Sequence, residues 1–172
     1  MVEAHLPQKT LASGAHSARR HSRRRVAPLA AVKAGLLAGA IAFCLLQFIG
    51  IVIYDESPWK LLRMVAAMAR GPAALEPDDE FSGPLALAGM TLFFALSLLY
   101  ALALSFLVAE SPRRYSALVG LAFGVSLYCA NFHGFTVLFP WFISFRTVDT
   151  LLVHALFGIA AAQSYGVFQR RT

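Results

Sequence analysis

Four long runs of apolar residues divide the chain, and short polar stretches separate them. The runs cover approximately Leu29–Ile53, Pro84–Val108, Tyr115–Leu138 and Thr150–Phe168. Each is long enough to cross a hydrocarbon core of roughly 30 Å, which takes about 20 helical residues. Barrel strands alternate apolar and polar residues over segments of about ten, and these runs do not alternate. Since a helix satisfies its backbone hydrogen bonds within itself, the pattern predicts four transmembrane helices.

Composition agrees with a membrane protein and sets the limits of its domain. Of the 172 residues, 58% are hydrophobic and only 14% are charged, whereas about a quarter of a soluble domain is charged. From Pro84 to Ala109 there is no Asp, Glu, Lys, Arg or His. We therefore predict an all-α fold with one four-span domain over residues 28–172, embedded in a lipid bilayer. Residues 1–27 are polar and basic, and we expect a disordered cytoplasmic tail that contacts anionic lipids and binds no nucleic acid.

The positions of the arginines predict how the helices are oriented. Arginines occur before the first run, between the second and third runs at Arg113 and Arg114, and after the fourth at Arg170 and Arg171. The other two connections mix their cations with most of the acidic residues of the chain. Because cytoplasmic loops carry the excess of Lys and Arg, both termini are expected in the cytoplasm.

Two short segments of the chain resemble each other. "SPWKLLRM" at Ser57–Met64 and "FPWFISFRT" at Phe139–Thr147 each place Pro-Trp after an apolar run and an arginine about one helical turn later. Further matching positions are Gly35 and Gly120, Gly39 and Gly124, Cys44 and Cys129, and the segments Phe93–Leu98 and Val153–Gly158. We interpret these matches as an ancestral duplication. Two helical hairpins would then point the same way and be related by an axis along the membrane normal, as parallel repeats are in some transporters.

Each Pro-Trp turn is expected at the outer membrane interface. Proline begins a helix well, and tryptophan prefers the headgroup layer. After the first turn, the leucines, Val65 and Met68 fall on one helical side, while Lys60, Arg63 and Arg70 fall on another. This pattern predicts a short amphipathic helix that lies on the membrane surface. The predicted interface anchors are Trp59, Arg63, Trp141 and Arg146.

Glycines spaced four apart indicate where helices pack. Small residues let helix backbones approach closely in lipid, where no hydrophobic force draws helices together. The predicted packing positions are Gly35, Gly39, Gly120, Gly124 and Gly158. We expect the first and third helices to pack against each other, or each against a neighbour, through these stripes.

Polar groups inside the runs are few, and such groups in a membrane are candidates for function. The residues of a possible polar cavity are Gln47, Asn131, His133 and His154. Three interpretations stay open: hydrogen bonds between helices, a transport cavity in which histidine carries a proton, and haem or metal ligation through His133 and His154. There is no CxxC, HExxH or GxxxxGK[ST] motif, so we expect no enzyme and no cofactor.

A resemblance to a known group of proteins rests on three of these segments and the Gly-rich first run. They are "SPW…RMVAAMARG" at Ser57–Gly71, "NFHGFTVLFPWF" at Asn131–Phe142 and "HALFG" at His154–Gly158. From about residue 30 onward the chain resembles small four-span bacterial inner-membrane proteins of unknown function, some of which carry the label sodium:proline symporter. The resemblance implies a four-span fold in a bacterial inner membrane and brings no established activity. The label implies little, because true sodium/solute symporters are far larger.

These observations favour a non-catalytic accessory or envelope protein that packs into a homo-oligomer or a complex with a membrane protein partner. The first alternative is a small oligomeric transporter or channel-like protein, because four helices seldom enclose a pathway alone. The second alternative is a haem or metal-binding membrane protein.

Overall fold

The structure, a computed structural model, describes residues 26–77 and 79–170. Residues 1–25 of the expected tail lie outside this part of the chain. The described residues form helices and connecting turns, and they contain no strand. The long helices are α1 (Pro28–Phe48), α3 (Gly83–Glu110), α4 (Ser116–Cys129) and α5 (Val148–Phe168), and α2 (Lys60–Arg70) is shorter.

Short segments of tighter or wider helix connect these elements. α1 continues into the π-helical segment η1 (Ile49–Ile53), and α4 continues into the π-helical segment η4 (Ala130–Gly134). The 3₁₀ turns are η2 (Pro72–Ala74), η3 (Arg113–Tyr115), η5 (Phe135–Val137) and η6 (Pro140–Phe145).

Four continuous helical stretches are long and apolar enough to cross a membrane. They are Pro28–Ile53, Gly83–Glu110, Arg113–Val137 and Val148–Phe168. Each agrees to within a few residues with one of the four predicted runs. The prediction of an all-helical fold with four long apolar helices is therefore confirmed.

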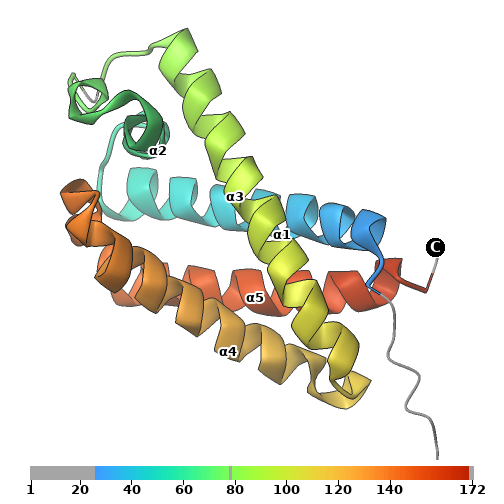
Figure 1. Cartoon of the computed structure of the whole chain (residues 1–172). Coiled ribbons are helices and arrows are strands. Elements are labelled where there is room, and N and C mark those ends of the chain that lie inside the picture. The colour runs from blue at the N-terminus through green and yellow to red at the C-terminus, as the bar shows by residue number, and fades with distance from the viewer. Residues whose placement is uncertain (1–25, 78, 171–172) are drawn as a thin grey trace, which may run out of the picture.

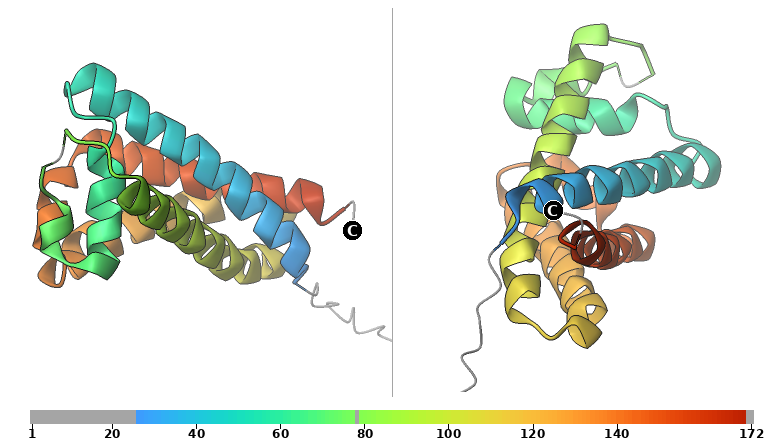
Figure 2. Two further views of the ribbon diagram at one scale, coloured as in Figure 1. Left: turned by 90° about the horizontal axis from the view of Figure 1, so that it is seen from above. Right: turned by 90° about the vertical axis from the view of Figure 1, so that its right-hand side faces the viewer.

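We call the end that carries α2 the spread end, because the start of α3 stands apart from the other long helices there (Figures 1 and 2). The opposite end, where α1 begins and α5 ends, is called the converging end. α1 and α5 lie side by side and run in opposite directions, α4 packs on α5, and α3 crosses α1. At the converging end, the backbone N–H of Ala27 donates to the hydroxyl of Tyr165 over 3.1 Å. The first described residues and the end of α5 thus lie at the same end. α2 lies at the opposite, spread end, where it packs on α3.

Local sequence explains where these helices begin and end. Pro28 and Pro84 stand in the first turns of α1 and α3, where the N–H that proline lacks would have no helical partner. The side chain of Thr147 caps α5 by accepting from the N–H of Thr150. α2 ends at Gly71, whose φ of +86° is unfavourable for any residue with a Cβ atom.

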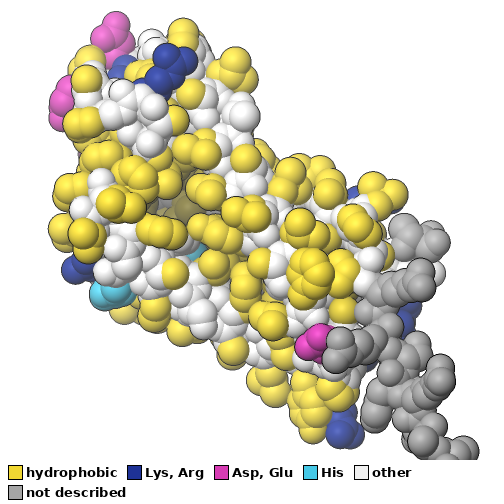
Figure 3. Space-filling view, in the orientation of Figure 1, with side chains coloured by type: hydrophobic (Ala, Val, Ile, Leu, Met, Phe, Trp, Pro, Cys, Tyr) yellow, Lys and Arg dark blue, Asp and Glu magenta, His cyan; other side chains and the backbone are white. Residues whose placement is uncertain are grey.

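The core consists largely of small residues. Alanines fill the buried side of α1, and they meet the buried face of α5 around Ala161, Ala162 and Tyr165. Large apolar side chains such as Leu36, Leu99 and Leu118 point outward instead and are exposed. Figure 3 shows hydrophobic side chains over the middle of the molecule and charged side chains near its two ends. This distribution suits a protein whose outer surface meets lipid.

The glycine stripes face the neighbouring helix of the same hairpin. Gly35 and Gly39 of α1 lie against Leu98 and Ser97 of α3. Gly120 and Gly124 of α4 lie against α5, where a Cβ on Gly120 would overlap the carbonyl oxygen of Gly158. The first and third helices therefore do not meet through their stripes, and the second of the two predicted arrangements is the one found.

α2 is a helix, as expected, but its charged residues do not share one exposed side. Residues Leu61 to Ala67 are all buried, and Arg63 among them is only 4% exposed. α2 reaches this depth because Gly89 of α3 has no side chain, so that the backbone of Leu62 can lie directly against it. The expected polar face that included Arg63 is wrong, since amphipathic periodicity cannot show that protein covers the second side of a helix as well.

A side-chain hydrogen bond joins the end of α1 to the start of α5. The hydroxyl of Tyr54 donates to Oδ1 of Asp149 over 3.0 Å. That bond is the main reason why the pKa of Tyr54 is raised above its usual value of 10, and slight desolvation and the charges of Asp149 and Glu56 act in the same direction.

This link predicts a pH-dependent contribution to stability. Because folding raises the pKa of Tyr54, the contribution is present below the unfolded pKa of about 10 and is lost as the pH rises through the folded value. We expect Tyr54→Phe to lower the melting temperature of the detergent-purified chain slightly at pH 7 to 9. The difference from wild type should shrink at higher pH, and a difference that stays constant up to pH 11.5 would contradict this assignment.

Candidate functional site

A chamber of about 290 Å³ lies at the spread end of the bundle, between α2 and the four long helices. Its lining is almost wholly apolar, and none of the lining residues is Lys, Arg, Asp or Glu. Seven of the lining side chains are phenylalanines: Phe93, Phe132, Phe135, Phe139, Phe142, Phe145 and Phe157. We refer to this space as the chamber.

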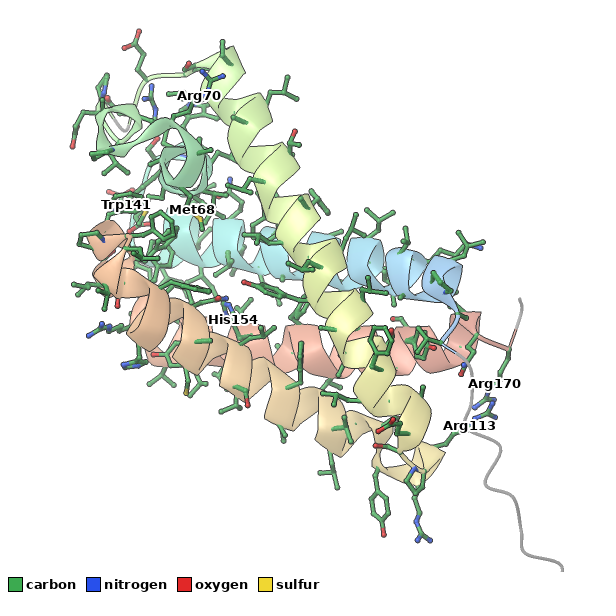
Figure 4. The ribbon with its side chains drawn as sticks, in the orientation of Figure 1. Met68, Arg70, Arg113, Trp141, His154 and Arg170 are labelled. Atoms are coloured by element: carbon green, nitrogen blue, oxygen red, sulfur yellow. The ribbon has the colours of Figure 1, made fainter. Side chains whose placement is uncertain are left out.

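The chamber opens on the face of the molecule that α3 and α4 share. Figure 3 shows a hollow on this face, below α2, with hydrophobic side chains around it. In Figure 4, Met68 of α2 lies on one side of the space and His154 of α5 on the other, and both line the chamber. Because the surrounding surface is apolar, the opening faces the region that lipid would occupy.

Most of the phenylalanines come from the segment that follows α4. Phe132 belongs to η4, Phe135 to η5, and Phe142 and Phe145 to η6. The ring of Phe132 is stacked on that of Phe145 with 6.3 Å between centroids. This segment thus folds back over the spread end and forms one wall of the chamber through its aromatic rings.

The π-helical turn at η4 depends on Arg146. A π turn interrupts the regular hydrogen bonding of an α-helix, so carbonyl groups there need other donors. Nε of Arg146 donates to the carbonyl oxygen of Phe132 over 2.6 Å, and its Nη2 donates to Oγ1 of Thr136 over 2.7 Å. Arg146 therefore fastens the loop before α5 to the end of α4.

Arg63 fastens the other loop at this end in the same way. Its Nε and Nη2 donate to the carbonyl oxygen of Glu80, and its Nη1 donates to the carbonyl oxygen of Ala74 over 3.2 Å. The two tryptophans also contact protein. The ring of Trp59 lies 4.6 Å from that of Phe81, and Nε1 of Trp141 donates to the carbonyl oxygen of Met64. The predicted anchors all hold loops in place around the chamber.

Asn131 and His154 bring polar atoms to the chamber. The hydroxyl of Tyr100 on α3 donates to Oδ1 of Asn131 over 2.9 Å, which links α3 to the π turn. Nδ1 of His154 lies 2.9 Å from the carbonyl oxygen of Thr150. Tyr100, Asn131 and His154 all line the chamber. The ring of His154 also meets the edge of Phe132, with 5.2 Å between centroids.

Gln47 and His133, the other two residues of the predicted polar cavity, lie outside the chamber. Gln47 donates through Nε2 to the carbonyl oxygen of Pro58 and so ties α1 to the loop before α2. His133 is exposed, and its ring packs 5.7 Å from that of Tyr128. Of the four residues of the predicted cavity, two therefore line the chamber and two do not. The rarity of polar residues in the runs singled out all four, but it gave no information about which way each side chain turns.

The two histidines share a neighbour. The ring of Tyr128 lies 6.1 Å from that of His154 as well as near that of His133. Among the described residues, no three His, Cys, Asp or Glu side chains lie together in a metal-binding group. Cys44 and Cys129 are unpaired and exposed.

Tyr100 is one of the few polar residues within the runs, and the predicted cavity did not include it. It lies on α3 in the series Phe93, Leu96, Ser97, Tyr100, whose spacing places all four on one helix face, and all four line the chamber. Ser97 and Tyr100 interrupt an otherwise apolar run, so their shared face was a usable signal.

Comparison of the chain with protein-family models, with curated proteins and with solved structures gives no match. The chemistry of the chamber is therefore the basis for a function. An apolar cavity with a few polar groups at defined positions is the usual form of a small-molecule site. Among the described residues, none that lines the chamber carries a charge with which a phosphate or carboxylate could form an ion pair.

Proposed function

We propose that this protein is a non-catalytic integral membrane protein that binds a lipophilic molecule in the chamber. The observation that supports this most directly is an apolar volume of about 290 Å³, lined by seven phenylalanines, beside an apolar outer surface. Empty apolar space of this size forfeits dispersion contacts, whereas a bound apolar molecule restores them. A molecule dissolved in the bilayer would reach the opening between α3 and α4 without entering water.

The proposal includes the orientation and location expected from the sequence. Both termini would lie in the cytoplasm, at the converging end, and the chamber would lie toward the outer side of a bacterial inner membrane. Figure 4 shows Arg113 and Arg170 at the converging end and Arg70 and Trp141 at the spread end, where the acidic loops also lie. A cationic converging end supports this orientation.

The ancestral duplication is also part of the proposal, and two sets of contacts support it. Gly35 lies against Leu98 and Gly120 lies against Gly158, which are matching positions in the two halves of the sequence. In the same way, Gly39 lies against Phe94 and Gly124 lies against His154. In addition, the first helix of each hairpin ends in a π-helical segment, η1 and η4. One hairpin design, used twice, accounts for these similarities.

The proposal also includes association of this protein with other copies of itself or with another membrane protein. A protein that holds a lipid-like molecule without a reaction of its own would serve a homo-oligomer or a membrane protein partner that uses the molecule. The resemblance to small four-span inner-membrane proteins of unknown function fits such an accessory role. A transport pathway has less support, because Gln47 and His133 do not line the chamber.

The proposal is tested with dodecylbenzene, a probe that has a ring and an alkyl chain but no polar group. Native mass spectrometry of the full chain in mild detergent should show one bound molecule per chain. Ala42→Phe should abolish this binding because Ala42 lines the chamber. Ala40→Phe is the matched control, since Ala40 is exposed on the same helix. If wild type binds no dodecylbenzene and no other lipophilic probe, the proposed function is refuted.

A further inference from the structure

Two polar atoms on the chamber wall have no partner among the hydrogen bonds of the described residues. The carbonyl of Thr150 can only accept, so Nδ1 of His154 carries a proton, and Nε2 of the neutral ring is then an acceptor. The hydroxyl of Tyr100 occupies Oδ1 of Asn131, which leaves the amide N–H groups of Asn131 as donors. His154 and Asn131, which both line the chamber, thus keep one acceptor atom and one donor group for a ligand.

The polar part of a matching molecule must be neutral. No Lys or Arg lines the chamber, so a phosphate or carboxylate would give up its hydration without gaining a counter-charge. No Asp or Glu lines it either, which is unfavourable for an ammonium group for the same reason. Hydroxyl and carbonyl groups remain, and these are the groups that pair with Nε2 of His154 and the amide of Asn131.

The aromatic lining favours a flat ring next to these polar groups. Phe132 presents its ring close to that of His154, at 5.2 Å, and further phenylalanines surround the space. Aromatic rings pack well against one another edge to face or offset. The chamber is near the lower end of the range of about 300–1,000 Å³ for ligand sites, so it holds a substituted ring and only the beginning of a long chain. The remaining chain would leave through the opening between α3 and α4.

We infer that the chamber is a binding site for a lipid-soluble quinol, a benzene-type ring with two hydroxyl groups and an apolar tail. One hydroxyl donates to Nε2 of His154, and an oxygen of the ring accepts from the amide of Asn131. The oxidised form, a quinone, has no hydroxyl to donate, so it keeps the contact with Asn131 and loses the contact with His154. The site therefore prefers the quinol. This inference rests on the proposed function, since it names the molecule that the chamber holds.

The experiment compares two probes of nearly the same shape on the full chain. Under anaerobic conditions, native mass spectrometry measures binding of a decyl-substituted benzoquinol and of its dimethyl ether, which cannot donate. Wild type should bind the quinol about tenfold more tightly, the effect of one neutral hydrogen bond in an apolar site. His154→Leu should abolish this preference. His133→Leu is the control, because His133 is exposed and lies outside the chamber.

The outcomes separate this inference from the proposed function. If dodecylbenzene binds but wild type binds quinol and ether equally, the quinol inference is wrong and the apolar site stands. If no probe binds, both are wrong. The comparison on wild type needs no variant, so it decides the matter even if His154→Leu fails to fold. A haem absorption band in the purified chain that His154→Leu removes would overturn the inference in favour of haem on Nε2.

Discussion

Gly158→Ala should destabilise the protein strongly. A Cβ atom at this position would overlap the carbonyl oxygen of Gly120 and lie 2.9 Å from the backbone nitrogen of Gly124. Backbone atoms cannot turn aside as a side chain can, so α4 and α5 would have to separate. Overpacking of this kind costs about 1–3 kcal/mol, and we expect the upper part of that range out of a total stability of about 5–15 kcal/mol.

The matched control for this prediction is Gly166→Ala on the same helix. A Cβ atom there would meet nothing within 4 Å, and alanine favours a helix over glycine by up to about 1 kcal/mol. Denaturation of the purified variants in detergent, followed by circular dichroism, should show loss of stability for Gly158→Ala alone. Equal melting of Gly158→Ala and wild type would show that the two helices do not lie as close as described.

The second large effect is expected for Arg63→Ala. This change removes the guanidinium that donates to the carbonyl oxygens of Ala74 and Glu80 at a site where Arg63 is 4% exposed. An unsatisfied buried polar group costs about 1–3 kcal/mol, so loss of donors to two carbonyls should cost about 2–4 kcal/mol in all. Arg63→Lys should recover only part, because one ammonium group cannot reproduce the planar fork of donors.

Hydrogen exchange gives a local measurement of the same prediction. In Arg63→Ala, exchange should become faster in the loop at residues 72–82 than in α4 and α5. Arg70→Ala provides the control, because Arg70 is an exposed residue on the same helix. Uniform acceleration over the whole chain, or none, would show that Arg63 does not hold this loop.

The length of the apolar runs was sufficient to predict the four long helices, because a backbone in lipid must satisfy its hydrogen bonds internally and a helix does so. It could not predict which helices are neighbours. Glycine spacing identified the packing faces of α1 and α4. It did not identify the partner, because a glycine face can pack against any helix whose surface lets the backbones approach. The choice of α3 for Gly35 and of α5 for Gly120 depends on three-dimensional complementarity.

The candidate site was only partly predictable for a different reason. Asn131 and His154 were identified because polar residues are rare in such helices. Gln47 and His133 are also polar residues in apolar runs, so sequence alone could not separate them from the other two. The structure shows that Gln47 donates to the carbonyl oxygen of Pro58 and does not line the chamber. No prediction was made for the seven phenylalanines. Their convergence depends on the π turn at η4 and on the hydrogen bonds of Arg146, which no hydrophobic period reveals.

The backbone contact between α4 and α5 also determines which parts of the molecule can move. At Gly120, Gly124 and Gly158 the two backbones lie directly against each other, so one helix cannot slide past the other there without the pair separating. We expect the pair to move as one body. We therefore expect motion that admits a guest molecule in α3 and α2, which reach the chamber through side chains such as Tyr100 and Met68. In this view the helix pair α4 and α5 stays in place during ligand entry, while α2 and α3 shift relative to it.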